Sequence, residues 1–367
     1  METIRVIVID DSALMRKMIS DILESDQRIQ VIGTARNGRE GIEKIKELSP
    51  DVVTMDVNMP VLDGISALRE IMTDHPVPVI ILSSDGEDGG TDNTIKAIEF
   101  GAVDFIAKPS GEISLDIKTI QKELISKVIA AKDATLSTAP TSTKIERLIK
   151  KKPMVHRNCC SRGQTMIGIG TSTGGPRALQ QLLTDLPEDF KVPIFIVQHM
   201  PPTFTKSLAK RLDALTPFHV KEAEHSEVVQ ESTVYIAPGD YHMRVEQVGV
   251  DYVIKLSKDK PINNHRPSVD ALFYSLAELE GIHKIAVILT GMGSDGSNGI
   301  RRIKQRDEDA IVIAESEETS IIYGMPKAAL NTNLVDKVLP SKKIANFVTH
   351  PAETPIAPPV GEPADPA

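Results

Sequence analysis

The sequence predicts an α/β protein of two domains, each built on a parallel sheet. Its 367 residues exceed one ordinary domain. Short apolar runs alternate with helical patterns in the first third of the chain and again after Met166, and this alternation is typical of a parallel sheet covered by helices. Between these stretches the alternation stops. We therefore expect domains at 1–125 and 164–349, a linker at 126–163 and a tail at 350–367.

In the first domain, four apolar runs have the length of buried strands. They are residues 4–9, 52–55, 77–82 and 103–107. After the first run, Met15, Ile19 and Ile22 recur at helical spacing. Strands separated by helices predict a doubly wound sheet, with helices on both faces.

The second domain shows the same alternation, with one exception. Its strand-like runs are 166–169, 194–197, 234–237, 253–256, 285–289 and 311–314. The stretch 234–256 is broken by Pro238-Gly239 and by Gly249, which favours a short antiparallel section. The linker is rich in Ser and Thr, with a short helix expected at 145–149, and the proline-rich tail is predicted to be disordered.

Composition excludes several classes of function. The formal net charge of −9 argues against nucleic acid as a partner. No run approaches the roughly 18 apolar residues that a membrane span needs, and the N-terminus lacks the regions of a signal peptide. We therefore expect a cytoplasmic protein without membrane insertion. The adjacent Cys159 and Cys160 give neither a disulfide framework nor a metal-binding spacing.

Polar side chains follow the predicted strands of the first domain. Asp10 and Asp11 follow the first run, Asp56 the second, Ser83 the third and Lys108 the fourth. The carboxyl ends of parallel strands meet at one crevice, so these groups should converge. Three carboxylates would repel one another without a cation, and oxygen ligands suit Mg²⁺. The chemistry that fits is phosphoryl transfer onto a carboxylate, with Asp56 as the acceptor because it stands alone.

A glycine-rich turn in the second domain carries a candidate nucleophile. Ser172 lies in Gly170-Thr-Ser-Thr-Gly-Gly175, between a predicted strand and a helix. Such a turn can expose a serine hydroxyl, but it can equally hold a phosphate or cap the helix.

Two further residues favour catalysis. His199 and Asp295 each follow an apolar strand, at the same sheet edge as Ser172, and together they supply nucleophile, base and orienting carboxylate. The glycine-rich loop around Met292 leaves backbone N–H groups free for an oxyanion. Rivals for these roles are two histidines and two carboxylates: His242, His265, Asp240 and Asp270.

These motifs resemble two known families. Residues 4 to about 122 resemble the receiver domain of bacterial response regulators, through Asp10, Asp11, Asp56, Ser83 and Lys108-Pro109. The resemblance implies that Asp56 is phosphorylated, that Asp11, Asp56 and the carbonyl of Asn58 hold Mg²⁺, and that Phe105 is the aromatic switch residue.

The chain as a whole, from Ile4 to about Phe347, resembles the chemotaxis protein-glutamate methylesterases. The matching motifs are Thr-Ser172-Thr-Gly-Gly, Gln-His199-Met-Pro and Thr-Gly-Met292-Gly-Ser-Asp295-Gly. The resemblance implies a Ser172–His199–Asp295 triad with the Met292 N–H as oxyanion donor, needing no cofactor for hydrolysis. It also implies hydrolysis of glutamate methyl esters on methyl-accepting chemotaxis receptors, possible glutamine deamidation, and a chemotaxis histidine kinase as phosphodonor.

Two other classes of function compete with this interpretation. A DNA-binding response regulator would need a basic helix-turn-helix after the linker, where the sequence instead predicts an α/β domain. A scaffold without catalytic activity would keep the fold but lose the chemistry, whereas all three triad positions are intact.

Overall fold

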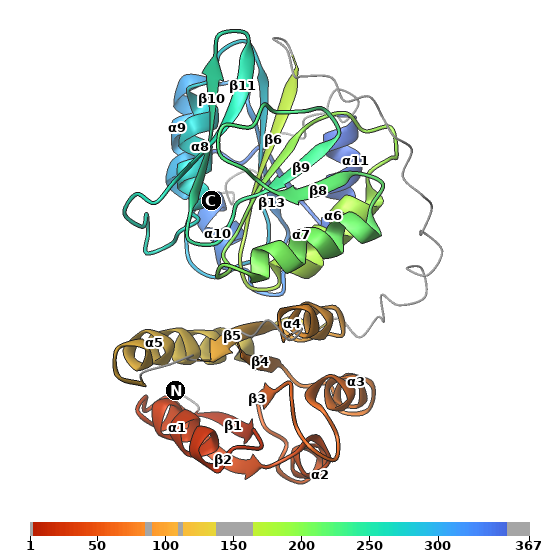
Figure 1. The fold of residues 1–367 in the computed structure, drawn as a ribbon, viewed down its shortest axis with the longest axis vertical. Coiled ribbons are helices and arrows are strands. Elements are labelled where there is room, and N and C mark those ends of the chain that lie inside the picture. The colour runs from red at the N-terminus through yellow and green to blue at the C-terminus, as the bar shows by residue number, and fades with distance from the viewer. Residues whose placement is uncertain (1–2, 85–89, 109–112, 137–163, 351–367) are drawn as a thin grey trace, which may run out of the picture.

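A computed structural model describes residues 3–84, 90–108, 113–136 and 164–350, which form two α/β domains (Figure 1). The short helix expected at 145–149, the two cysteines and the tail beyond His350 lie outside the described residues. No helix in the described ranges combines the length and apolar character needed to cross a membrane.

The first domain is a five-stranded parallel sheet in the order β2-β1-β3-β4-β5. Its strands are β1 (Ile4–Ile9), β2 (Ile29–Ala35), β3 (Val52–Asp56), β4 (Val79–Ser84) and β5 (Asp104–Lys108). Its helices are α1 (Ala13–Glu24), α2 (Gly38–Leu48), α3 (Gly64–Asp74), α4 (Gly90–Glu99) and α5 (Ile113–Lys132). The doubly wound fold predicted from the sequence is confirmed. Helix α5 continues past residue 125, where the first domain was expected to end.

Local sequence explains where three of these helices begin. The side chains of Ser12, Asn37 and Asp63 each accept a hydrogen bond from a backbone N–H three residues on, which caps α1, α2 and α3. The strand β2 escaped the sequence reading because it lies at the sheet edge, and Gln30, Gly33 and Thr34 interrupt its apolar residues.

The second domain is built on a seven-stranded sheet in the order β14-β13-β12-β6-β7-β9-β8, in which every pairing is parallel. Its strands are β6 (Thr165–Thr171), β7 (Ile194–Gln198), β8 (His219–Glu222), β9 (Thr233–Ile236), β12 (His283–Ile288), β13 (Ile311–Glu315) and β14 (Lys337–Leu339). Its helices are α6 (Gly175–Asp185), α7 (Phe204–Leu215), α8 (Val269–Ala277), α9 (Ser297–Arg306), α10 (Met325–Leu330) and α11 (Ser341–Thr349). Within residues 164–350, where a DNA-binding output domain was the alternative, the structure has this parallel α/β architecture in place of a helix-turn-helix.

The antiparallel section is smaller than predicted. Among the strands of the described residues, antiparallel pairing is confined to β10 (His242–Val248) and β11 (Asp251–Ser257), which form a separate two-stranded sheet. The expectation that the run from Val234 is antiparallel was wrong, because β9 pairs in parallel with both β7 and β8. The burial of the strands shows the difference: all four residues of β9 are buried inside the main sheet, whereas exposed residues interrupt β10 and β11.

The two domains pack against each other through α4 and β5 of the first domain and α6 and α7 of the second. Helix α4 and strand β5 of the first domain face α6 and α7 of the second (Figure 1), and α4 packs against both of these helices. Because Phe105 and Lys108 lie on β5, this packing brings the acidic edge of the first domain close to the second.

Candidate active site and acidic pocket

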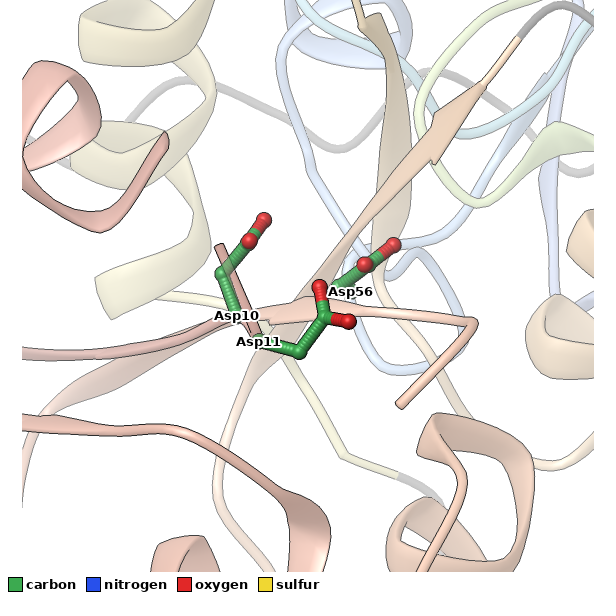
Figure 2. Close-up of side chains that lie close together, drawn as sticks. All are labelled: Asp10, Asp11 and Asp56. Carbon is green, nitrogen blue, oxygen red and sulfur yellow. The ribbon is translucent and has the colours of Figure 1, made fainter. Parts of the chain in front are cut away.

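The acidic residues of the first domain converge as the sequence predicted. Asp10 and Asp11 follow β1, Asp56 ends the neighbouring strand β3, and one carboxylate oxygen of each lies within 4.8 Å of the others. Figure 2 shows the three carboxylate groups gathered at these strand ends. Asp10 and Asp56 are buried, whereas Asp11 is exposed to solvent.

Lys108 neutralises part of this charge. Its Nζ lies 2.8 Å from Asp10 Oδ2 and 2.9 Å from Asp56 Oδ2. Burial opposes the charge on Lys108, but its hydrogen bonds to the two carboxylates raise its pKa. Burial raises the pKa of Asp56, an effect that the hydrogen bond from Lys108 partly offsets. The carboxylate cluster thus still favours a second cation.

The chemistry of this donor set fits Mg²⁺. Three carboxylates with oxygens in reach of one ion are hard ligands, and Lys108 balances only one of their charges. Asn58 is exposed beside Asp56, and its backbone N–H donates a hydrogen bond to that carboxylate. Its predicted role as a carbonyl ligand stays a prediction.

The remaining pocket residues lie on the neighbouring strands. The Oγ of Ser83, at the end of β4, accepts a hydrogen bond of 2.6 Å from Thr94 Oγ1. Phe105, on β5, is buried. Its ring does not point to solvent but stacks on Phe204 of the second domain, with ring centroids 4.5 Å apart.

In the second domain, Ser172 lies in the turn between β6 and α6, as predicted. Gly174 adopts φ +79°, a conformation that suits glycine, and Gly175 N–H donates to the Ser172 carbonyl at 2.8 Å. The Ser172 N–H donates to the Thr290 carbonyl at 3.1 Å, which ties the turn to the loop after β12.

That loop passes very close to the serine. A Cβ added to Gly291 would lie 2.8 Å from Ser172 Cβ and 2.9 Å from its backbone nitrogen, so only glycine fits there. The next residue is Met292, and we find no acceptor for its N–H within the described ranges. The loop therefore holds a backbone donor next to the hydroxyl-bearing turn.

His199 and Asp295 form a hydrogen-bonded pair at the same sheet edge. His199 follows β7, whose residue Gln198 pairs with Thr171 of β6, so Ser172 and His199 leave adjacent strands side by side. His199 Nε2 lies 2.9 Å from Asp295 Oδ2. Its other ring nitrogen, Nδ1, is buried and has no partner among the described residues. One nitrogen is thus engaged by the carboxylate and the other is left for a reacting group.

Asp295 is held ionised by its surroundings. The residue is buried, which opposes its charge, but the hydrogen bond from His199 and others from Val269 N–H and Asn263 hold its pKa well below the usual range. The Oγ of Ser268 donates a further bond of 2.9 Å. An ionised carboxylate against an imidazole can fix the tautomer of the ring and stabilise its protonated form.

The rival residues occupy other positions. His242 is buried on β10, where its Nε2 pairs with the Lys260 carbonyl at 3.1 Å. Asp240 binds Arg266 and Lys258, away from the triad. Neither residue has a hydrogen bond or ion pair with His199 or Asp295 among the contacts of the described residues.

His265 and Asp270 lie beside the His199–Asp295 pair without taking the place of either residue in it. The His265 ring stacks on that of His199, with centroids 3.8 Å apart, and burial lowers its pKa to about 4. Asp270 accepts hydrogen bonds from Gly299 N–H at 2.6 Å and from Asn263. Sequence reasoning weighed these two as substitutes for triad members and missed Asn263, which contacts Asp295.

The interface between the domains reaches the turn that carries Ser172. Thr173, one residue after Ser172, donates a hydrogen bond to Asp104 Oδ2 of the first domain. Lys127 binds the same carboxylate and the Phe105 carbonyl. The acidic pocket and the serine are thus connected by contacts through β5.

Comparison with known proteins finds a family match for each of the two domains. The CheB methylesterase family matches residues 167–348, and the response regulator receiver domain matches residues 6–120. The protein-glutamate methylesterase/protein-glutamine glutaminase of Oceanobacillus iheyensis is 50% identical over 349 residues, covering 95% of this chain and 99% of the relative. The protein-glutamate methylesterase/protein-glutamine glutaminase of Bacillus subtilis is 44% identical over 350 residues, covering 94% of this chain and 98% of the relative.

Among solved structures, the crystal structure of the Thermotoga maritima CheB methylesterase catalytic domain is 44% identical, with a TM-score of 0.49. The match covers 52% of this chain and 97% of the chain in that crystal structure. The two family matches and the identity to relatives over nearly the full length agree with the resemblance found in the sequence. This chain belongs to the CheB methylesterase family, with a receiver domain preceding the methylesterase domain.

Proposed function

We propose that this protein is a phosphorylation-activated serine hydrolase that demethylates glutamate methyl esters on methyl-accepting chemotaxis receptors, releasing methanol. The observation that carries the proposal is the buried His199–Asp295 pair beside the turn of Ser172. The names of the relatives supply the substrate, a protein glutamate ester, and a second activity on glutamine.

The geometry supports the following roles. The Ser172 hydroxyl attacks the ester carbonyl and passes its proton to His199 Nδ1, the ring nitrogen that Asp295 does not engage. Asp295 stabilises the imidazolium, and the Met292 N–H donates to the oxyanion of the tetrahedral intermediate. His199 then protonates the departing methoxide, so that methanol leaves and an acyl-enzyme remains. Water hydrolyses the acyl-enzyme with His199 again acting as base.

The same site would act on receptor glutamines. A primary amide reaches a similar tetrahedral oxyanion, and protonation by His199 would release ammonia in place of methanol. Both reactions leave a glutamate side chain on the receptor.

The receiver domain would control access to this site. In our proposal, the pathway's histidine kinase phosphorylates Asp56, with Mg²⁺ held by Asp11, Asp56 and the Asn58 carbonyl, and with Lys108 and Ser83 contacting the phosphoryl group. Mg²⁺ would supply charge neutralisation for the entering phosphoryl group. Support for control of access comes from the contacts of Phe105 and Asp104 with the second domain, next to Ser172. We expect the reaction in the cytoplasm, where the signalling helices of such receptors lie.

Mass spectrometry of a methylated receptor tests the proposal. Incubation with the protein, acetyl phosphate and Mg²⁺ should remove one methyl group per cleaved ester and release methanol. The Ser172→Ala protein should lose several orders of magnitude of activity while keeping its fold and its receiver phosphorylation. Methanol release close to wild type by folded Ser172→Ala would exclude Ser172 as the nucleophile.

A further inference from the structure

One side chain outside the triad touches the triad carboxylate and a second buried carboxylate at once. Asn263 Nδ2 donates to Asp295 Oδ1 at 3.0 Å and to Asp270 Oδ2 at 2.7 Å. The amide group carries two N–H bonds, so it can serve both acceptors at the same time. Neither the family resemblance nor the triad assigns Asn263 any role.

The two carboxylates need such a bridge because both are buried. Asp270 and Asp295 are 0% and 2% exposed. Burial raises the pKa of Asp270, and the nearby charge of Asp295 raises it further. Two like charges without water between them repel strongly. A donor placed between them replaces part of that repulsion with two favourable contacts.

The backbone around Asn263 is shaped to hold this position. Ile262 and His265 exchange two backbone hydrogen bonds, of 3.1 and 2.8 Å, and close a tight turn. The two residues between them, Asn263 and Asn264, adopt φ +52° and +64°, which asparagine tolerates better than most residues. The turn therefore directs Asn263 at the carboxylates from a surface loop.

Several other partners of the two carboxylates lie in helices α8 and α9. Asp270 is buried in the first turn of α8 and accepts from Gly299 N–H at 2.6 Å, in α9. Asp295 accepts from Val269 N–H at 2.7 Å and from Asp270 N–H at 3.2 Å, also in α8. Among the side-chain hydrogen bonds of the described residues, those of Asn263 join the two carboxylates to each other.

We propose that Asn263 is a positioning residue of the active site, which fixes Asp295 against His199 by bridging it to Asp270. It acts through Asp295 and does not touch the reacting atoms. The inference rests on the proposed hydrolase function. It predicts that loss of the Asn263 N–H donors lowers kcat and leaves KM unchanged, because the substrate contacts are untouched.

Two substitutions separate a donor role from a space-filling role. Asn263→Gly removes the donors, tolerates the positive φ, and leaves room for water to donate in their place, so kcat should fall about 10-fold. Asn263→Asp keeps the shape but puts acceptor oxygens beside two carboxylates, so kcat should fall about 100-fold or more. A residue that only filled space would give the reverse order, with Asp close to wild type.

Asn264 provides the matched control. It lies in the same turn, at a similar φ, and we find no side-chain hydrogen bond from it among the described residues. Asn264→Gly and Asn264→Asp should keep kcat within about twofold of wild type. The same changes at the two adjacent positions thus compare a residue that contacts the carboxylates with a neighbour that does not.

The experiment measures kcat and KM for p-nitrophenyl acetate and for a methylated receptor. A second readout is the downfield proton NMR signal of the His199–Asp295 hydrogen bond, which should broaden or move upfield in both Asn263 variants and stay unchanged in the Asn264 variants. A wild-type protein inactive on both substrates would contradict the proposed function. An active wild type with Asn263→Asp equal to it in kcat, or with an unchanged proton signal, would overturn the positioning role alone.

Discussion

A salt bridge between Arg211 and Glu99 joins the two domains. We call the packed arrangement of the domains the closed state, and a substitution in this salt bridge can weaken it without changing a residue of either proposed site. Arg211 on α7 donates from its Nε and a terminal nitrogen to the two oxygens of Glu99 on α4, at 2.6 and 2.9 Å. The Arg211 side chain is 35% exposed and that of Glu99 is 11% exposed, so the pair is half shielded from water. A paired geometry of this kind is stronger than a surface ion pair.

We predict that Arg211→Ala raises the activity of the unphosphorylated protein. The change removes both hydrogen bonds and leaves Glu99 shielded and unpaired while the domains stay together. A surface ion pair contributes little to stability, whereas breaking a buried pair costs more. Because this pair is partly shielded, we expect its loss to destabilise the closed state by about 1–3 kcal/mol. That free energy shifts the ratio of closed to open protein by about 5- to 150-fold.

Methanol release from a methylated receptor, without acetyl phosphate, measures the effect. The basal rate should rise by a similar factor, up to the ceiling set by the phosphorylated wild type. Reversing the charges, in the double variant Arg211→Glu with Glu99→Arg, should return the basal rate toward that of wild type.

A similar pair inside the second domain serves as control. Arg302 on α9 donates from Nε and a terminal nitrogen to Glu278, the residue that follows α8, and these two helices pack against each other. Arg302→Ala should leave the basal rate unchanged. If Arg211→Ala also left the basal rate unchanged while activation by acetyl phosphate stayed normal, the contact between α4 and α7 would not restrain the enzyme.

Three further predictions concern the chemistry of the two sites. Asp295→Asn should lower kcat by about 10⁴-fold, because an amide favours the wrong tautomer of the histidine and cannot stabilise its charged form. The rate of p-nitrophenyl acetate hydrolysis measures this loss. Gly291→Ala should lower kcat by at least about 100-fold with the circular dichroism spectrum retained, because the added Cβ would meet Ser172 and Met325 Sδ at under 3 Å. Asp56→Ala should keep the basal rate of methanol release when acetyl phosphate and Mg²⁺ are added. Wild type should also stay at the basal rate when EDTA removes Mg²⁺. Activation in either case would exclude phosphorylation of Asp56 as the trigger.

The sequence by itself determined the two-domain α/β architecture and the positions of the site residues along the chain. Buried strands read as short apolar runs, and the polar residue after each run lies at the carboxyl edge of a parallel sheet. That local rule predicted that Asp10, Asp56, Ser172, His199 and Asp295 lie at or beyond the carboxyl ends of strands, where the structure has them. The motifs around them were specific enough to indicate the family, which the comparisons confirmed.

The tertiary structure alone decided how distant segments pair. The direction of β9 depends on its neighbour β7, and the apolar run of β9 carries no information about that partner. Asp295, and not Asp270, is hydrogen-bonded to His199. This choice depends on how the loops before α8 and α9 pack together, and the two carboxylates lie 25 residues apart in the chain. The bridge from Asn263 and the stack of Phe105 on Phe204 are likewise invisible to periodicity, because each contact joins residues from separate elements. Local patterns fix which residues reach a sheet edge, whereas long-range packing fixes which of them touch.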